Sequence, residues 1–235
     1  MARWHIKAVL LDMDGTLIDT ERVYLESSIA AFSALGYTDG VAALCHTMIG
    51  IPGPECQKMM RAHFGPDFPI AEVNRLFAAN TAATLAAGMR LKPGALALLD
   101  AIEAAGLPRA IVTSSSRRTA AQHLAAAGID GRFDAILTRD DVSRGKPHPD
   151  LYLLAAARLG TPAQACVAVE DSNPGVAAAH AAGAITLMVP DIVQPTEETR
   201  QCCAAVLPDL EATIDLLAAN GVLRSPRRSG EPGAE

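Results

Sequence analysis

The sequence predicts an α/β protein with a parallel sheet as its core and an α-helical domain inserted after the first strand. Beyond residue 91, short apolar runs alternate with helical segments, and this alternation implies parallel strands joined by right-handed crossovers. Residues 19–88 show no strand pattern of any length and are predicted to be helical. We therefore expect a core domain of residues 1–18 and 89–224, interrupted by a helical domain.

The first strand is predicted at residues 7–12. Its centre, residues 8–11, is an uninterrupted apolar run of the kind found in strands buried on both faces, and Gly15 marks its end. The inserted block then contains three segments in which apolar residues recur at helical spacing or alanine predominates. These predicted helices are 21–35, 55–63 and 71–87.

The rest of the core is predicted from the same alternation, with glycines ending most helices. The predicted strands are 109–113, 133–138, 165–169 and 184–189, and the predicted helices are 93–105, 117–127, 149–159 and 174–182. Residues 225–235 contain almost no apolar side chains, so we expect this tail to be disordered.

Composition excludes several classes of function. The chain has 235 residues, half of them hydrophobic, and a net charge of -6, which argues against nucleic-acid binding. It contains no apolar run of membrane-spanning length, and we see no export signal. Its five cysteines have no Cys-x-x-Cys spacing, so neither a disulfide framework nor a zinc site is indicated. We expect a cytoplasmic protein, monomeric or at most a weak homo-oligomer.

Two carboxylates, Asp12 and Asp14, come at the end of the first predicted strand. Ligands of open α/β sheets bind at the carboxyl ends of the strands. Acids two positions apart would share one face if the strand continued, and they would then repel each other unless Mg²⁺ lies between them or one pKa is raised. The alternative is that both are ordinary turn and helix-cap residues.

Three further polar segments fall at predicted strand or loop ends that should converge on Asp12. Residues 113–116 carry four hydroxyls before a helix, suited to phosphate or simply to helix capping. Lys146 lies between glycine and proline, where it is either a phosphate-neutralising cation or a solvated lysine. Glu170 and Asp171 end a buried strand, where they suit Mg²⁺ or a helix start.

These segments resemble the four motifs of the haloacid dehalogenase (HAD) superfamily, in its phosphatase branch. The sequences are DMDGTLIDT at 12–20, TSSS at 113–116, GKPHP at 145–149 and EDSNPG at 170–175. The resemblance implies a Rossmann-like HAD core with a helical cap at residues 19–88. In the second motif, Ser114 is the expected phosphate-binding residue and Thr113 the alternative.

The resemblance also implies roles for individual residues. Asp12 is expected to be the nucleophile that forms an aspartyl phosphate, and Asp14 the general acid and base. Phosphate charge is expected to be stabilised by Ser114, Ser115 and Lys146. Mg²⁺ is the expected cofactor, held by Asp12, the main-chain carbonyl of Asp14, Asp171 and Glu170.

The expected substrate is a small phosphorylated metabolite. Cap residues Gly50, Gly53 and Glu55 are expected to contact it; the alternative is that this segment only connects two helices. Related β-phosphoglucomutases carry Lys-Gly and Arg in this loop, whereas this chain has Ile49 and Gly53 there. We therefore favour a sugar-phosphate phosphatase over a mutase or a phosphoglycolate phosphatase. A signalling receiver domain is disfavoured because it has no helical insertion after its first strand.

Overall fold

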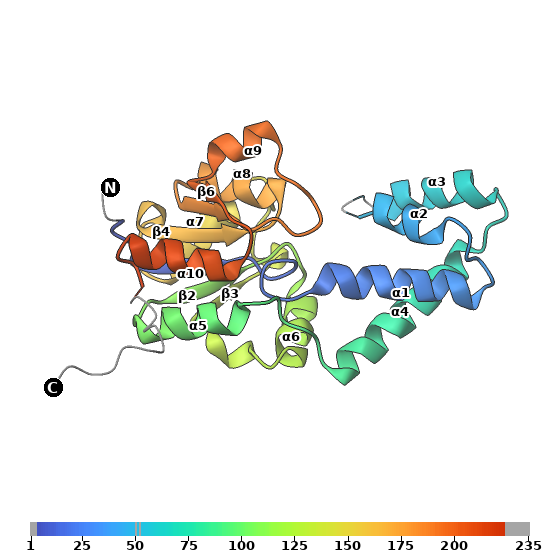
Figure 1. Cartoon of the computed structure of the whole chain (residues 1–235), viewed down its shortest axis with the longest axis horizontal. Helices are drawn as coiled ribbons and strands as arrows, with labels where there is room; N and C mark the ends of the chain where they lie inside the picture. Colours follow the sequence, from blue (N-terminus) through green and yellow to red (C-terminus); the bar gives the residue numbers. More distant parts are fainter. Residues whose placement is uncertain (1–3, 50, 52, 224–235) are drawn as a thin grey trace, which may run out of the picture. The chain divides into compact units, whose positions relative to one another are not determined.

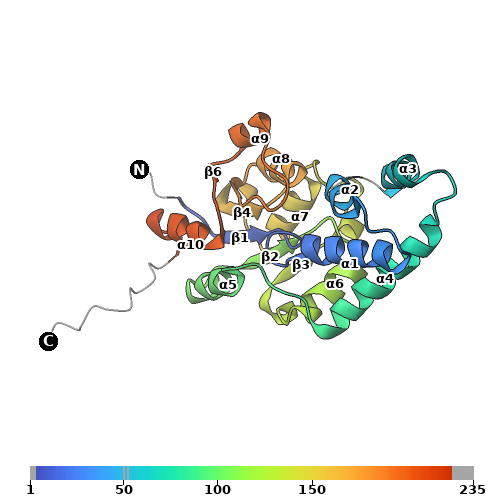
Figure 2. The same ribbon diagram turned by 45° about the vertical axis from the view of Figure 1, so that its right-hand side comes forward.

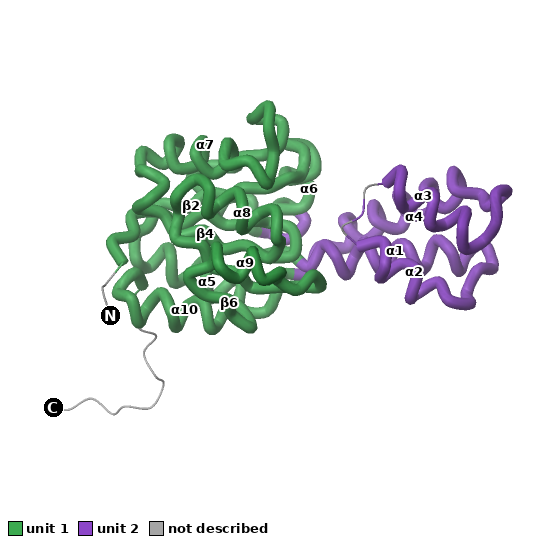
Figure 3. Tube along the Cα trace, turned by 90° about the horizontal axis from the view of Figure 1, so that it is seen from above, with its two compact units in different colours: residues 1–18, 91–125, 129–235 green, residues 19–90, 126–128 purple. Residues whose placement is uncertain are grey.

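The computed structural model describes residues 4–49, 51 and 53–223, and the chain forms two compact units (Figure 1). Unit 1 comprises residues 1–18, 91–125 and 129–235, and unit 2 comprises residues 19–90 and 126–128 (Figure 3). The predicted disordered tail, 225–235, lies outside the described residues. Within the described part, no helix combines the length and apolar character required to span a membrane.

Unit 1 is built on a six-stranded parallel sheet with the order β3-β2-β1-β4-β5-β6, which can be followed in Figure 2. Its strands are β1 Ala8–Leu11, β2 Arg109–Val112, β3 Ala135–Leu137, β4 Cys166–Glu170, β5 Ile185–Met188 and β6 Ala205–Val206. The predicted α/β class and parallel sheet are confirmed. All four residues of β1 are fully buried, as expected for a central strand covered on both faces.

Helices cover both faces of this sheet. They are α5 Ala95–Ala104, α6 Arg117–Ala126, α7 Asp150–Arg158, α8 Asn173–Ala181, α9 Glu197–Cys202 and α10 Leu210–Ala219. On one face, Leu10 and Val112 form a core with Leu151 and Tyr152 of α7 and with Ala178 of α8. Figures 1 and 3 show α5 and α10 on the opposite side from α7. Unit 1 therefore has three layers, with the sheet between two layers of helices, and loops lie at the ends of the strands.

Among the described residues of unit 2, all elements of regular secondary structure are helices. Its elements are α1 Thr20–Ala34, α2 Val41–Thr47, α3 Gly53–Phe64 and α4 Ile70–Ala87. Aromatic rings fill its centre: Phe32 stacks on Phe68 with ring centroids 5.6 Å apart, and Phe64 stacks on Phe68 at 4.7 Å. The sequence reading missed α2, which spans only seven residues and offers too short a window for a periodic pattern.

Candidate active site

The carboxyl ends of the three central strands bring together the polar residues that the sequence analysis singles out. Asp12 directly follows β1, Thr113 directly follows β2, and Glu170 is the last residue of β4. Because β2, β1 and β4 are neighbours, the residues that end these strands lie at the same end of the sheet. Lys146 reaches the same place from the loop before α7 and contacts both Asp12 and Glu170.

Lys146 is a buried counter-ion of two carboxylates. Its Nζ donates to Asp12 Oδ1 and to Glu170 Oε1, both at 2.5 Å, and to the carbonyl of Val112 at 2.9 Å. The fully buried Tyr152 donates from its hydroxyl to the same Glu170 oxygen at 2.6 Å. The Lys146 side chain is only 4% exposed. These contacts exclude the alternative of a solvated surface lysine.

The charges in this group do not balance. Burial raises the pKa of Asp12, and although Lys146 lowers it, the nearby charge of Glu170 raises it again, to about 8. Burial alone would lower the pKa of Lys146, but the two carboxylates hold it above its usual value. One ammonium group therefore faces more carboxylate charge than it can neutralise, and the site favours a further cation.

Asp12, Glu170 and Asp171 form a cluster that fits a small divalent cation. All three are buried, and one carboxylate oxygen from each lies within 4.8 Å of the others. Thr16 donates from its hydroxyl to Asp171 Oδ1 at 3.3 Å, which orients that carboxylate. Mg²⁺ binds hard oxygen ligands of this type, so the donor set suits it. The fourth predicted ligand, Asp14, was expected to contribute only its main-chain carbonyl.

Two glycines leave room for these carboxylates. A Cβ atom at Gly175, in the first turn of α8, would overlap the carboxylate of Glu170. A Cβ atom at Gly15, whose φ is 83°, would overlap the carboxylate of Asp171. Both glycines belong to the sequence motifs, and the structure gives each a steric reason for its place.

We expect Gly175→Ala to weaken Mg²⁺ binding by about tenfold or more, because the added methyl group must displace Glu170. The φ angle of Gly175 is not positive, so backbone strain does not contribute. Isothermal titration of the protein with Mg²⁺ measures the effect. Gly131→Ala is the matched control, since no atom beyond the two flanking residues lies within 4 Å of a Cβ at that position. Equal Mg²⁺ affinities of the two variants would contradict this account.

The side chain of Asp14 belongs to a second group of hydrogen-bond donors. Its Oδ2 accepts from Ser115 Oγ at 2.8 Å and from Thr113 Oγ1 at 3.2 Å. Its Oδ1 lies 3.1 Å from Nδ1 of His123, a residue of α6 whose side chain is 3% exposed. Burial alone would raise the pKa of Asp14, but the hydrogen bonds from His123, Ser115 and Thr113 lower it. The environment therefore favours the carboxylate anion.

This arrangement corrects the expectation that the side chains of Asp12 and Asp14 would share one face if the strand continued. The strand ends at Leu11, so the alternation that would put both side chains on one face does not extend to Asp14. Asp12 pairs with Lys146, while Asp14 pairs with His123 and two hydroxyl groups. Nucleophile and acid/base candidates thus have separate partners.

The predicted phosphate-binding hydroxyls have two different environments. Ser114 is exposed, whereas Ser115 and the alternative residue Thr113 donate to Asp14. Which hydroxyl contacts phosphate stays a prediction. The sequence analysis missed His123, because a single histidine in a helix carries no local signal for a partner 109 positions away.

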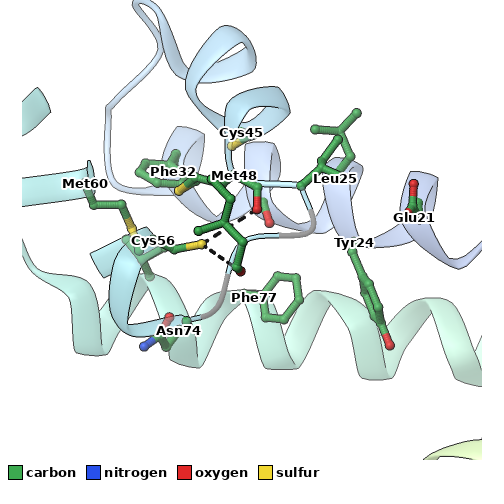
Figure 4. Close-up of a pocket in the computed structure, with 15 residues that line it drawn as sticks. Glu21, Tyr24, Leu25, Phe32, Cys45, Met48, Cys56, Met60, Asn74 and Phe77 are labelled. Carbon is green, nitrogen blue, oxygen red and sulfur yellow. Dashed lines mark hydrogen bonds between the residues drawn. The ribbon is translucent and has the colours of Figure 1, made fainter. Parts of the chain in front are cut away.

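The three residues of unit 2 that were predicted to face the substrate have different locations. Gly50 lies outside the described residues. Gly53 begins α3 and lines a cavity of about 430 Å³ inside this unit, whose walls include Phe32 and Phe77 (Figure 4). Glu55 is exposed, and its carboxylate pairs with Lys58 at 2.7 Å. The lining of this cavity is mainly apolar.

Comparisons with known proteins agree with the motifs. The model of the haloacid dehalogenase-like hydrolase family matches residues 6–183. Hexitol phosphatase A of Escherichia coli is 36% identical over 185 residues, which cover 78% of this chain and 82% of that protein.

Two solved structures resemble more than nine tenths of the chain. One is a HAD family hydrolase of Deinococcus radiodurans with bound phosphate and sodium, with a TM-score of 0.81, 29% identity, and coverage of 94% and 99% of the two chains. The other, a β-phosphoglucomutase candidate from Thermotoga maritima, has a TM-score of 0.79, 25% identity, and coverage of 91% and 99%. The chain therefore belongs to the haloacid dehalogenase-like hydrolases, in the branch that contains phosphatases and β-phosphoglucomutases.

Proposed function

We propose that this phosphatase hydrolyses a small phosphorylated metabolite, a sugar phosphate above all, with Mg²⁺ as cofactor and an aspartyl phosphate as intermediate. The observation that carries the proposal is the buried carboxylate of Asp12, held between the ammonium group of Lys146 and the acids Glu170 and Asp171. A carboxylate attacks an anionic phosphoryl group only if positive charge offsets their repulsion, and Lys146 supplies part of that charge.

The proposed reaction has two steps. Asp12 attacks phosphorus, and the bond from phosphorus to the leaving oxygen breaks as the bond to the Asp12 carboxylate forms. Asp14 protonates the leaving alcohol and then, as a base, accepts a proton from the water that hydrolyses the aspartyl phosphate. Asp12, the Asp14 main-chain carbonyl, Asp171 and Glu170 would hold Mg²⁺, which would help to neutralise the phosphate charge. Lys146 stabilises the same charge from the protein side.

Unit 2 is proposed to act as the cap that selects the leaving group, with Gly53 and Glu55, at the start of α3, facing the substrate. The sugar-phosphate assignment is supported by the hexitol phosphatase relative. A mutase is the alternative, favoured by the Thermotoga maritima structure. Ile49 and Gly53, in place of the mutase pattern, support hydrolysis instead.

The test is phosphate release from a panel of hexitol, hexose and pentose phosphates, phosphoglycolate and nucleotides, with Mg²⁺ or with a chelator. We expect release that requires Mg²⁺, is fastest with a sugar or sugar-alcohol phosphate, and is absent in Asp12→Asn. Interconversion of a sugar 1-phosphate and 6-phosphate without release would favour the mutase. No turnover of any of these substrates would contradict the proposal.

A further inference from the structure

His123 is buried against the carboxylate to which the proposed function gives the acid/base role. It lies outside the four sequence motifs, and its Nδ1 is 3.1 Å from Asp14 Oδ1. We infer that His123 is a positioning residue, which holds the Asp14 carboxylate in the orientation from which Asp14 transfers protons to and from the substrate. This inference rests on the proposed function, since it requires Asp14 to be the acid and base.

The local sequence explains how His123 reaches Asp14. In α6, the fully buried Ala120 shares a face with His123, because side chains three positions apart lie together on a helix. That face carries the imidazole into the interior of unit 1. A ring N–H buried there needs an acceptor, and Asp14 provides one. The contact links α6 to the loop after β1.

The three donors to Asp14 are not equivalent. Thr113 and Ser115 both donate to Oδ2, from the loop that follows β2. Of these contacts, the one from His123 is made to Oδ1. The torsion about Cβ–Cγ of an aspartate is broad, and a further donor on the second oxygen narrows the range that two donors on the first oxygen leave. His123 therefore fixes the plane of the carboxylate, and proton transfer depends on that geometry.

A purely structural role for His123 makes a different kinetic prediction. If His123 only fills the core, its loss slows all substrates by one factor or only lowers stability. If it positions Asp14, its loss slows only those steps that need a proton from Asp14. The ratio kcat/KM reports formation of the aspartyl phosphate. A sugar alkoxide must be protonated as it leaves in that step, whereas 2,4-dinitrophenolate leaves without a proton.

The experiment compares wild type with His123→Leu and His123→Asn in the full chain with Mg²⁺. For His123→Leu, we expect kcat/KM for the best alkyl phosphate of the panel to fall by about tenfold to a hundredfold. For 2,4-dinitrophenyl phosphate, kcat/KM should change by less than about threefold, and a burst of dinitrophenolate should appear because Asp14 now activates water poorly. His123→Asn keeps an N–H near the Nδ1 position and should recover most of the alkyl phosphate activity.

His180→Leu, at an exposed histidine of α8, is the matched control and should behave as wild type. If His123→Leu does not fold, His123→Gln replaces it, because glutamine moves the N–H away from the Nδ1 position. Equal loss on both substrates, no loss, or no recovery with asparagine would overturn the inference. Failure of the proposed function is seen separately, as a wild-type protein that releases no phosphate from the panel.

Discussion

Asp12→Asn is expected to abolish phosphate release and, at the same time, to make the metal-free protein more stable. Removing the nucleophile closes the covalent route, and we expect kcat to fall by at least about 10³-fold. Stability should rise because burial and Glu170 raise the pKa of Asp12 to about 8, so that its ionised form is unfavourable in the folded protein. The amide has the same shape and no charge, and Lys146 keeps Glu170 as a partner.

The gain in stability has a defined pH dependence. The Asp12 carboxyl titrates near 3.8 when unfolded and near 8 when folded, so unfolding releases a proton between these values. The stabilisation that protonated Asp12 gives the folded wild type is therefore fully present below pH 3.8, and it is lost as the pH rises toward 8. Asparagine does not titrate. The difference in Tm should be smallest near the lower pKa, grow toward the upper one, and shrink when Mg²⁺ binds the wild type.

Differential scanning calorimetry in a chelating buffer measures this difference. Asp130→Asn, at an exposed position of unit 1, is the control and should alter neither stability nor activity. A lower Tm for Asp12→Asn in alkaline buffer would mean that Lys146 stabilises the ionised carboxylate more than burial disfavours it. In that case the charge imbalance described above would be wrong.

The strands and their ends could be predicted from local pattern because buried parallel strands are short apolar runs. Asp12 and Glu170 each end such a run, and β1 and β4 are parallel neighbours, so the two carboxylates meet at one end of the sheet. Lys146 lies in a loop, and its place beside them was expected from the motif that contains it. The edge strand β6 was missed because two residues carry no pattern. Helix α9 was also missed, although Thr196 caps its first turn by accepting from the N–H of Thr199.

The direction in which a side chain points could not be predicted in the same way. Whether Asp14 faces Asp12 or the hydroxyls after β2 depends on where β1 ends, and strand ends are poorly determined by sequence. The contact with His123 joins residues of two elements that share no motif. Long-range contacts of polar side chains depend on the three-dimensional packing, which the sequence pattern does not specify.

Lys146→Met should have the largest effect on stability. Removing one partner of a buried ion pair leaves the other charge uncompensated, which typically lowers the free energy of unfolding by about 3–5 kcal/mol. In a domain of this size we expect a fall in Tm of roughly 6–20 °C in chelating buffer. Mg²⁺ should restore part of it, since the ion supplies positive charge to the same carboxylates. Phosphatase activity should be lost as well.

The matched control is Lys92→Met. Lys92 pairs with Asp191 at 2.6 Å, but the two side chains are 21% and 16% exposed. The Lys146 side chain is 4% exposed, so the Lys92–Asp191 pair is the less buried of the two, and Lys92→Met should lower the free energy of unfolding by less than Lys146→Met does. Similar losses of stability in Lys92→Met and Lys146→Met would contradict the conclusion that burial of Lys146 makes its ion pairs important for stability.

The double variant Asp12→Asn/Lys146→Met tests whether these two charges act on each other. With Lys146 present, asparagine at position 12 removes a partly compensated negative charge. Without Lys146, it removes an uncompensated one, so the stabilisation by Asp12→Asn should be larger in the Lys146→Met background, with a coupling of about 0.5–3 kcal/mol. Chemical denaturation of the four proteins at alkaline pH in chelating buffer measures the coupling. Additive effects would mean that Lys146 serves Glu170 alone, and the nucleophile would then lack the cation that the proposed attack on phosphate requires.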